Sequence, residues 1–183
     1  MIARLRTLAA TLALGLLFIA FQPAPSPALA EEVLKREPHG QWMLRQSVVE
    51  GERVCSMVNM ATDESALVMV MAAADPATGE GSGIVVRIVP LSFQLPPGDK
   101  VDVTLTIGGS IWPLGVRRSP GAGKVLDIPM DGLATVGLLR SMVQGERMQV
   151  AVAGGGRFEI ELEGAATGQQ AFDTCVETFL VGN

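Results

Sequence analysis

Residues 147–163 read RMQVAVAGGGRFEIELE, and this stretch decides the expected fold. Large apolar residues occupy every second position on both sides of the glycine run Gly154–Gly156: Met148, Val150, Val152, Phe158, Ile160 and Leu162. Because side chains of a strand point alternately to its two faces, this period of two predicts strands with one buried face and one solvated face. The glycines supply the turn between them, so the stretch predicts a β-hairpin.

The spacing of apolar residues becomes helical after Gly164. Phe172, Cys175, Val176 and Phe179 stand at positions i, i+3, i+4 and i+7, which share one face of a helix. The sequence therefore predicts a C-terminal helix that packs on the sheet through this face.

Strand patterns also dominate the chain before the hairpin. Short apolar or alternating runs, separated by turn signals at 50–52, 75–79, 108–109 and 119–123, lie at 42–48, 54–60, 66–73, 83–90, 101–107, 111–116 and 125–129. One further helix is expected after Asp131, which is a good N-cap residue. Its predicted buried face consists of Leu133, Val136, Leu139 and Val143.

These elements predict one mainly β domain over residues 42–183. An antiparallel β-sandwich or a partly closed barrel suits the many short strands, with a short internal helix and a C-terminal helix. Residues 31–41 are charged and contain Pro38 and Gly40, so a flexible N-terminal lead is expected there.

Residues 1–30 have the pattern of a cleavable signal peptide. Arg4 and Arg6 precede an apolar run over 8–21, and Ala28-Leu29-Ala30 is a small-x-small cleavage site. The apolar run is shorter than the roughly 20 residues that span a bilayer, so cleavage after Ala30 is expected rather than an N-terminal anchor. The mature chain would then have no stable membrane span and would reside in the periplasm, in the outer envelope or outside the cell.

The charge balance argues against a nucleic-acid partner. Loss of Arg4 and Arg6 with the leader lowers the basic count from 14 to 12 against 19 acidic residues, for a net charge of −7. Basic residues are scattered, whereas a protein that neutralises phosphates needs them clustered.

Cys55 and Cys175 are the only cysteines of the chain. In an oxidising compartment such a pair is expected to form a disulfide. The bridge would close a loop of about 120 residues, which in the chain-entropy model stabilises by about 4 to 5 kcal/mol. A redox role is the alternative, but the C-x-x-C spacing of such sites is missing.

The residues offer no catalytic or metal-binding constellation. The chain has no tyrosine, and its one histidine, His39, lies on the expected lead, so triads and multi-histidine zinc sites are excluded. Glu159, Glu161 and Glu163 share one strand face and are interpreted as a solvated surface rather than a calcium site. Several methionines lie in predicted strands and are interpreted as core filler rather than metal ligands: Met57, Met60, Met69 and Met71. We therefore expect no metal and no cofactor.

The order of landmarks resembles the invasion-associated locus B family of secreted proteobacterial proteins. Trp42 is followed about a dozen residues later by Cys55, and the terminal strand 158–163 leads through Gly164 to a helix with Cys175. The proline-containing stretch 91–98 before the strand at Val101 is also similar to the family's middle region. The resemblance implies a small β-rich domain of the periplasm or outer envelope, linked in pathogenic members to host-cell entry, with no catalytic residues to carry over.

These observations predict a non-enzymatic envelope protein that binds another protein or an envelope component. A periplasmic hydrolase with an unrecognised carboxylate pair and a structural envelope subunit are the alternatives, and the oligomeric state stays open. Trp112, between the turn at Gly108-Gly109 and Pro113, is the candidate partner-binding residue. Its alternative role is to plug the end of the core, and Trp42 is assigned to the core.

Overall fold

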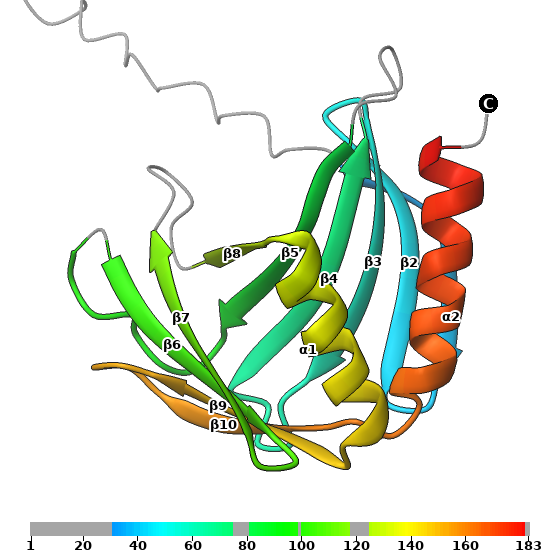
Figure 1. The fold of residues 1–183 in the computed structure, drawn as a ribbon. Helices are drawn as coiled ribbons and strands as arrows, with labels where there is room; N and C mark the ends of the chain where they lie inside the picture. The colour runs from blue at the N-terminus through cyan, green and yellow to red at the C-terminus, as the bar shows by residue number, and fades with distance from the viewer. Residues whose placement is uncertain (1–30, 75–80, 99, 118–124, 182–183) are drawn as a thin grey trace, which may run out of the picture.

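The structure, a computed structural model, describes residues 31–74, 81–98, 100–117 and 125–181. These residues form two antiparallel sheets and two helices (Figure 1). The six-stranded sheet has the order β1 (Glu31–His39), β2 (Trp42–Val49), β3 (Glu52–Met60), β4 (Ala66–Ala74), β5 (Gly81–Pro90), β8 (Leu126–Met130). The four-stranded sheet has the order β10 (Arg157–Glu161), β9 (Arg147–Val152), β6 (Lys100–Ile107), β7 (Ser110–Arg117).

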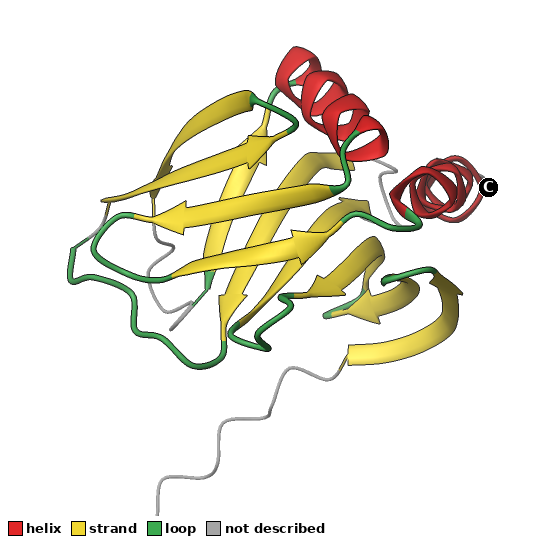
Figure 2. Cartoon of the chain, turned by 90° about the horizontal axis from the view of Figure 1, so that it is seen from below, coloured by secondary structure: helices red, strands yellow, loops and turns green. Residues whose placement is uncertain are grey.

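The helices are α1 (Gly132–Gln144) and α2 (Ala165–Cys175), and α2 continues as a π-helical turn, η1 (Val176–Val181). Figure 2 shows both helices at one end of the two sheets. The sheets do not close into a barrel, and the predicted mainly β fold with an internal and a C-terminal helix is confirmed as a sandwich.

The strand register of the six-stranded sheet separates an inner from an outer face. Met57 lies opposite Leu44 on β2 and Val70 on β4, and Val70 lies opposite Val86 on β5. All four side chains are buried in the core beneath the second sheet and the helices. Residues of the other parity therefore form the outer face, on which Met60 is exposed, whereas Val54 and Ser56 of the same strand are buried.

The disulfide joins these layers as predicted. Cys55 on β3 bonds Cys175 on α2, with their Cα atoms 6.1 Å apart and both side chains buried. Phe172, one turn before Cys175, is also buried, as is Trp42 at the start of β2. The C-terminal helix is therefore held on the inner face by a covalent bond as well as by apolar packing.

The expected flexible lead at 31–41 is wrong in its main part. Residues Glu31–His39 form the edge strand β1, which pairs antiparallel with β2 along its length, with one irregularity between Val33 and Lys35. Backbone hydrogen bonds to β2 hold this strand, so it forms without an alternating apolar pattern of its own. Charged residues on it suit an edge, because they discourage pairing with other chains.

Helix α1 begins as predicted but turns a different face inward. The Asp131 carboxylate accepts a hydrogen bond from the backbone N–H of Ala134 at 2.8 Å. Leu138, Leu139 and Met142 are the buried side chains, whereas Leu133 is 89% exposed. Val136 and Val143 are exposed as well, so of the expected buried face Leu139 alone was correct. The buried side chains all lie in the second half of the helix, and none in its first half is buried.

Three predictions lie outside the described residues: the signal peptide at 1–30 and the turns at 75–79 and 119–123. Over the ranges that are described, no helix has the length and apolar character needed to cross a membrane.

Candidate functional site

A tight turn between β3 and β4 forms one wall of the candidate site. The backbone N–H of Ala61 donates to Ala66 O at 2.8 Å, and that of Glu64 donates to Ala61 O at 2.9 Å. The Asp63 carboxylate accepts from the backbone N–H of Ser65 at 3.0 Å, and hydrogen bonding by Ser65 lowers the pKa of Asp63 below its ordinary value. Glu64 has a φ of 57°, an uncommon conformation for a non-glycine residue. The turn thus holds Glu64 in one defined position.

Strand β10 of the other sheet forms the opposite wall. The Asn59 side chain donates from Nδ2 to the backbone carbonyl of Glu161 at 2.7 Å, and the N–H of Thr62 donates to Glu159 O at 2.9 Å. Asn59 is only 5% exposed, so its amide needs such a partner. These bonds join the two sheets at this corner and satisfy part of the free edge of β10.

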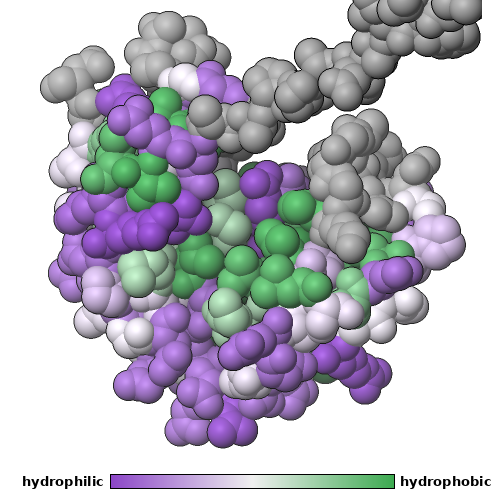
Figure 3. Space-filling model, turned by 180° about the vertical axis from the view of Figure 1, so that it is seen from behind, coloured by the Kyte–Doolittle hydropathy of each residue, from purple (hydrophilic) through white to green (hydrophobic). Residues whose placement is uncertain are grey.

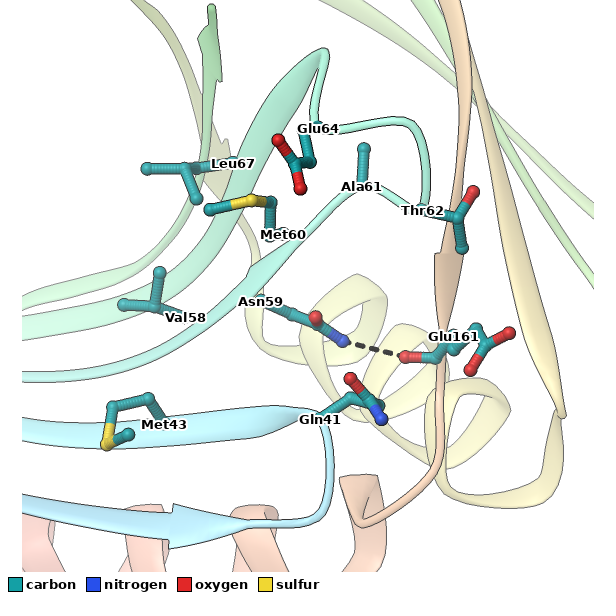
Figure 4. A pocket seen from close by; sticks show the side chains of 10 residues that line it. All are labelled: Gln41, Met43, Val58, Asn59, Met60, Ala61, Thr62, Glu64, Leu67 and Glu161. Carbon is teal, nitrogen blue, oxygen red and sulfur yellow. Dashed lines mark hydrogen bonds between the residues drawn. The ribbon is translucent and has the colours of Figure 1, made fainter.

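A hollow of about 540 Å³ lies between the two walls. Ten residues line it: Gln41, Met43, Val58, Asn59, Met60, Ala61, Thr62, Glu64, Leu67 and Glu161. Figure 4 shows Glu64 on the side of the turn and Glu161 on the side of β10, with Met60 and Asn59 between them. We call this hollow the corner groove.

The corner groove has an apolar floor with the Glu64 carboxylate beside it, and Figure 4 shows Glu161 turning its backbone carbonyl toward Asn59 and its carboxylate to the other side of β10. Met43, Val58, Met60 and Leu67 supply the floor from the outer face of the sheet, and Met60 is 47% exposed. Glu64 and Glu161 are its charged lining residues, and no lysine or arginine is among the ten. Neither carboxylate makes an ion pair with a described residue. Arg147 lies opposite Glu161 in the register of β9 and β10, so the groove combines apolar surface with the carboxylate of Glu64.

The floor continues across the outer face of the six-stranded sheet. Register places Met43, Val58 and Met69 in one row, and the row ends in Arg87 and Asp127. That last pair is bidentate, with Nε to Oδ1 at 2.6 Å and Nη2 to Oδ2 at 2.9 Å. Figure 3 shows apolar side chains gathered on this side of the molecule with hydrophilic ones around them.

The methionines did not all behave as core filler. Met57 is buried, whereas Met60 is exposed and Met69 and Met71 lie half-buried on the outer face. They differ because the side chains of Cys55 on β3, Val70 on β4 and every second residue from these face the core. Met60, Met69 and Met71 occupy the alternate positions, whereas Met57 shares the position of Cys55. The buried cysteine was the sequence signal that could have revealed this, since a disulfide to a packed helix requires Cys55 to face inward.

A second hollow, of about 470 Å³, lies between β1–β2 and α2. It contains Lys35, Glu37 and His39, with Lys35 Nζ 2.7 Å from one Glu37 oxygen and His39 Nε2 3.4 Å from the other. The lysine lowers the pKa of Glu37. The His39 side chain is only 14% exposed and lies on strand β1, not on the flexible lead that was expected. Across the described residues, no group of three or more potential ligands could hold a metal ion.

Trp112 lies against α1 rather than protruding from a loop tip. A Cβ built on Gly137 would come within 2.6 Å of the indole ring, so the ring packs where the helix carries no side chain. The side chain is half-buried against the core, while its neighbour Ile111 is 67% exposed. This placement favours the core role of Trp112, and a role in partner binding stays a prediction.

Comparison with known proteins identifies the fold. The sequence matches no protein family model and no curated protein. Among solved structures, the crystal structure of invasion associated protein B from Bartonella henselae is similar, with a TM-score of 0.51 and 15% sequence identity. The similarity covers 78% of this chain and 99% of that one. The chain has the invasion associated protein B fold. At this identity the likeness shows the fold alone, and it agrees with the resemblance found from the sequence landmarks.

Proposed function

We propose that this chain is an exported, non-enzymatic envelope protein that binds a partner protein at the corner groove. The observation that carries the proposal is an apolar floor with the exposed side chain of Met60, at a corner where hydrogen bonds fix both walls. Exposed apolar surface rimmed by polar groups is typical of interaction sites.

The disulfide, the leader-like sequence at 1–30 and the likeness to invasion associated protein B support export. A stable disulfide requires an oxidising compartment in most organisms. The periplasm, the outer envelope and the exterior of the cell all meet this requirement.

The enzyme alternative finds less support. A carboxylate used as a general acid or base is normally placed in a cleft that raises its pKa. Partial burial and the neighbouring Glu177 raise the pKa of the Asp173 carboxyl. Both are exposed on the surface of the C-terminal helix, outside either hollow. The proposal therefore assigns binding, not hydrolysis.

Site-specific cross-linking in the exporting cell tests the proposal. A photoreactive amino acid replaces Met60, and in a matched variant it replaces Glu52 at the other end of the same strand. We expect one protein adduct from position 60 that is missing from position 52. The adduct partner, once purified, should bind the mature chain, and Met60→Ser should weaken that binding at least tenfold. Identical adducts from both positions, or none from position 60, would refute the groove as the site.

Size analysis of the mature protein addresses the remaining alternative. A structural envelope subunit would self-associate, and its adduct from position 60 would be a second copy of this chain. A monomer with an adduct to a different protein supports the binding module.

A further inference from the structure

We infer that Met60 is a site of reversible oxidation, at which a peroxide converts the thioether to the sulfoxide and turns the floor of the corner groove from apolar to polar. The modification follows from how the fold exposes the sulfur-bearing side chains. Its effect on partner binding rests on the proposed function.

Thioethers are the sulfur groups of this chain that an oxidant can still attack. Both cysteines of the sequence are joined in the buried disulfide, which leaves no free thiol. A free thiolate would otherwise compete for the oxidant. An oxidant that reaches this protein therefore acts on its methionines.

The fold exposes one methionine far more than the others. Met60 is 47% exposed, and no other methionine among the described residues is exposed. Met57, Met142 and Met148 are at most 2% exposed in the core. The half-buried ones are Met43, Met69, Met71 and Met130. Since oxidation of a side chain requires access to it, Met60 is the methionine that reacts first.

The position of Met60 lets it react without loss of the site's framework. Met60 is the last residue of β3, and its register partner is Leu67 on β4. Successive side chains of a strand point to opposite faces, so Met60 points away from Asn59. Figure 4 shows its side chain on the side of Leu67, with the bond from Asn59 to Glu161 on the other side of β3. An oxygen added to the sulfur therefore leaves the hydrogen bond between the two walls intact.

The oxidation transfers two electrons from sulfur to a peroxide oxygen. A lone pair of the Met60 sulfur attacks one oxygen of hydrogen peroxide, the S–O bond forms as the O–O bond breaks, and the proton of the transferred oxygen moves to the departing oxygen, which leaves as water. Methionine sulfoxide reductases reverse the change. In that reaction two thiols supply two electrons and two protons, and the thioether, a disulfide and water are formed.

The sulfoxide changes what the groove offers to a partner. Its oxygen is a hydrogen-bond acceptor placed among the apolar side chains of the floor, which include Val58 and Leu67. A partner that covers this oxygen with apolar groups removes it from water without a hydrogen bond, and this costs binding free energy. Oxidation of Met60 should therefore weaken partner binding about tenfold, as Met60→Ser does.

Peroxide treatment of the mature, disulfide-bonded chain, followed by peptide-mapping mass spectrometry, measures the oxidation rate of each methionine. We expect Met60 to form the sulfoxide at least tenfold faster than Met57, Met142 or Met148, and ahead of every half-buried methionine. In guanidinium chloride this ranking should disappear, because unfolding exposes every thioether. A buried methionine that reacts as fast as Met60 in the folded chain, or a half-buried one that reacts first, would overturn the modification site.

Binding of the partner that cross-links at position 60 tests the effect of the modification. Treatment that oxidises Met60 should weaken binding about tenfold, and a methionine sulfoxide reductase should restore it. The same treatment should leave the affinity of Met60→Leu where it was before treatment. Met69→Leu is the matched control and should keep the full response, because Met69 lies on the outer face and does not line the groove. Unchanged binding after Met60 has become the sulfoxide would refute the effect.

The outcomes separate the inference from the proposed function. If Met60 oxidises selectively but position 60 gives no protein adduct, the modification site stands and the proposed function falls together with the effect on binding. If the adduct forms but Met60 oxidises no faster than Met57, the proposed function stands and the inference is wrong.

Discussion

Replacing Gly164 with alanine tests how the first hairpin is held against the start of the C-terminal helix. Gly164 precedes α2 with a φ of +82°, and a Cβ built there would overlap the backbone carbonyl of His39 and lie 2.8 Å from Gly40 N. Gly40 is packed reciprocally, since its own Cβ would lie 2.7 Å from Glu163 O. Two backbones thus touch at a point where neither has room for a side chain.

The cost of Gly164→Ala has two parts. A left-handed conformation costs a residue with a Cβ roughly 1–2 kcal/mol. The overlap adds about 1–3 kcal/mol, the usual cost of overpacking, because backbone atoms cannot rotate away as a flexible side chain can. We expect a loss of about 2–5 kcal/mol, a large fraction of the roughly 5–15 kcal/mol that stabilises a typical domain.

Gly51→Ala provides the matched control. Gly51 has a similar φ of +89°, but no heavy atom lies within 4 Å of the position that a Cβ would take there. It should lose only the conformational part, roughly 1–2 kcal/mol. Urea unfolding of both variants, followed by circular dichroism, measures the difference. Equal losses in the two variants would refute the close-approach argument.

Three other substitutions have defined outcomes. Cys175→Ser opens the bridge to Cys55 and should cost about 4 to 5 kcal/mol in the chain-entropy model, seen as a clear drop in Tm; an unchanged Tm would contradict this. Trp112→Ala should cost about 3 kcal/mol if the ring serves the core, whereas unchanged unfolding with lost partner binding would assign it to the interface. Asp173 has a raised pKa in the folded state, from partial burial and then from Glu177. Its contribution to the free energy of unfolding therefore increases as pH falls through that pKa. Asp173→Asn should therefore stabilise at neutral pH, by about 0.2–0.5 kcal/mol for the like-charged pair, and should flatten the acid-side pH dependence of unfolding; a loss of stability at pH 7 would show the reasoning to be wrong.

A local sequence pattern was enough to predict the elements in which apolar residues recur at a regular spacing. The alternation around Gly154–Gly156 predicted β9 and β10, and the helical spacing of Phe172 and Cys175 predicted α2. Asp131 marked the start of α1 because its side chain bonds a backbone N–H three residues away. In each case the interaction that forms the element spans only a few residues.

Elements that depend on a pairing strand or on a layer packed against them were predicted poorly. Strand β1 carries few apolar side chains, and its strand conformation comes from hydrogen bonds to β2. The expected face of α1 was wrong because periodicity identifies apolar positions, not which of them meets the core. Met60 was misplaced for the same reason, since the parity that faces inward on β3 is set by α2 and the second sheet.

From its sequence alone, this chain determines a disulfide-bonded, mainly β domain with an acidic surface and a helix at its end. The corner groove is a product of tertiary structure. Asn59 and Glu161, which join its walls, are 102 residues apart in the sequence. Glu64 and Met60 look like an ordinary turn and an ordinary strand residue in their local context. They form a site only because the packing of two sheets brings β10 against the turn and leaves Met60 exposed beside it.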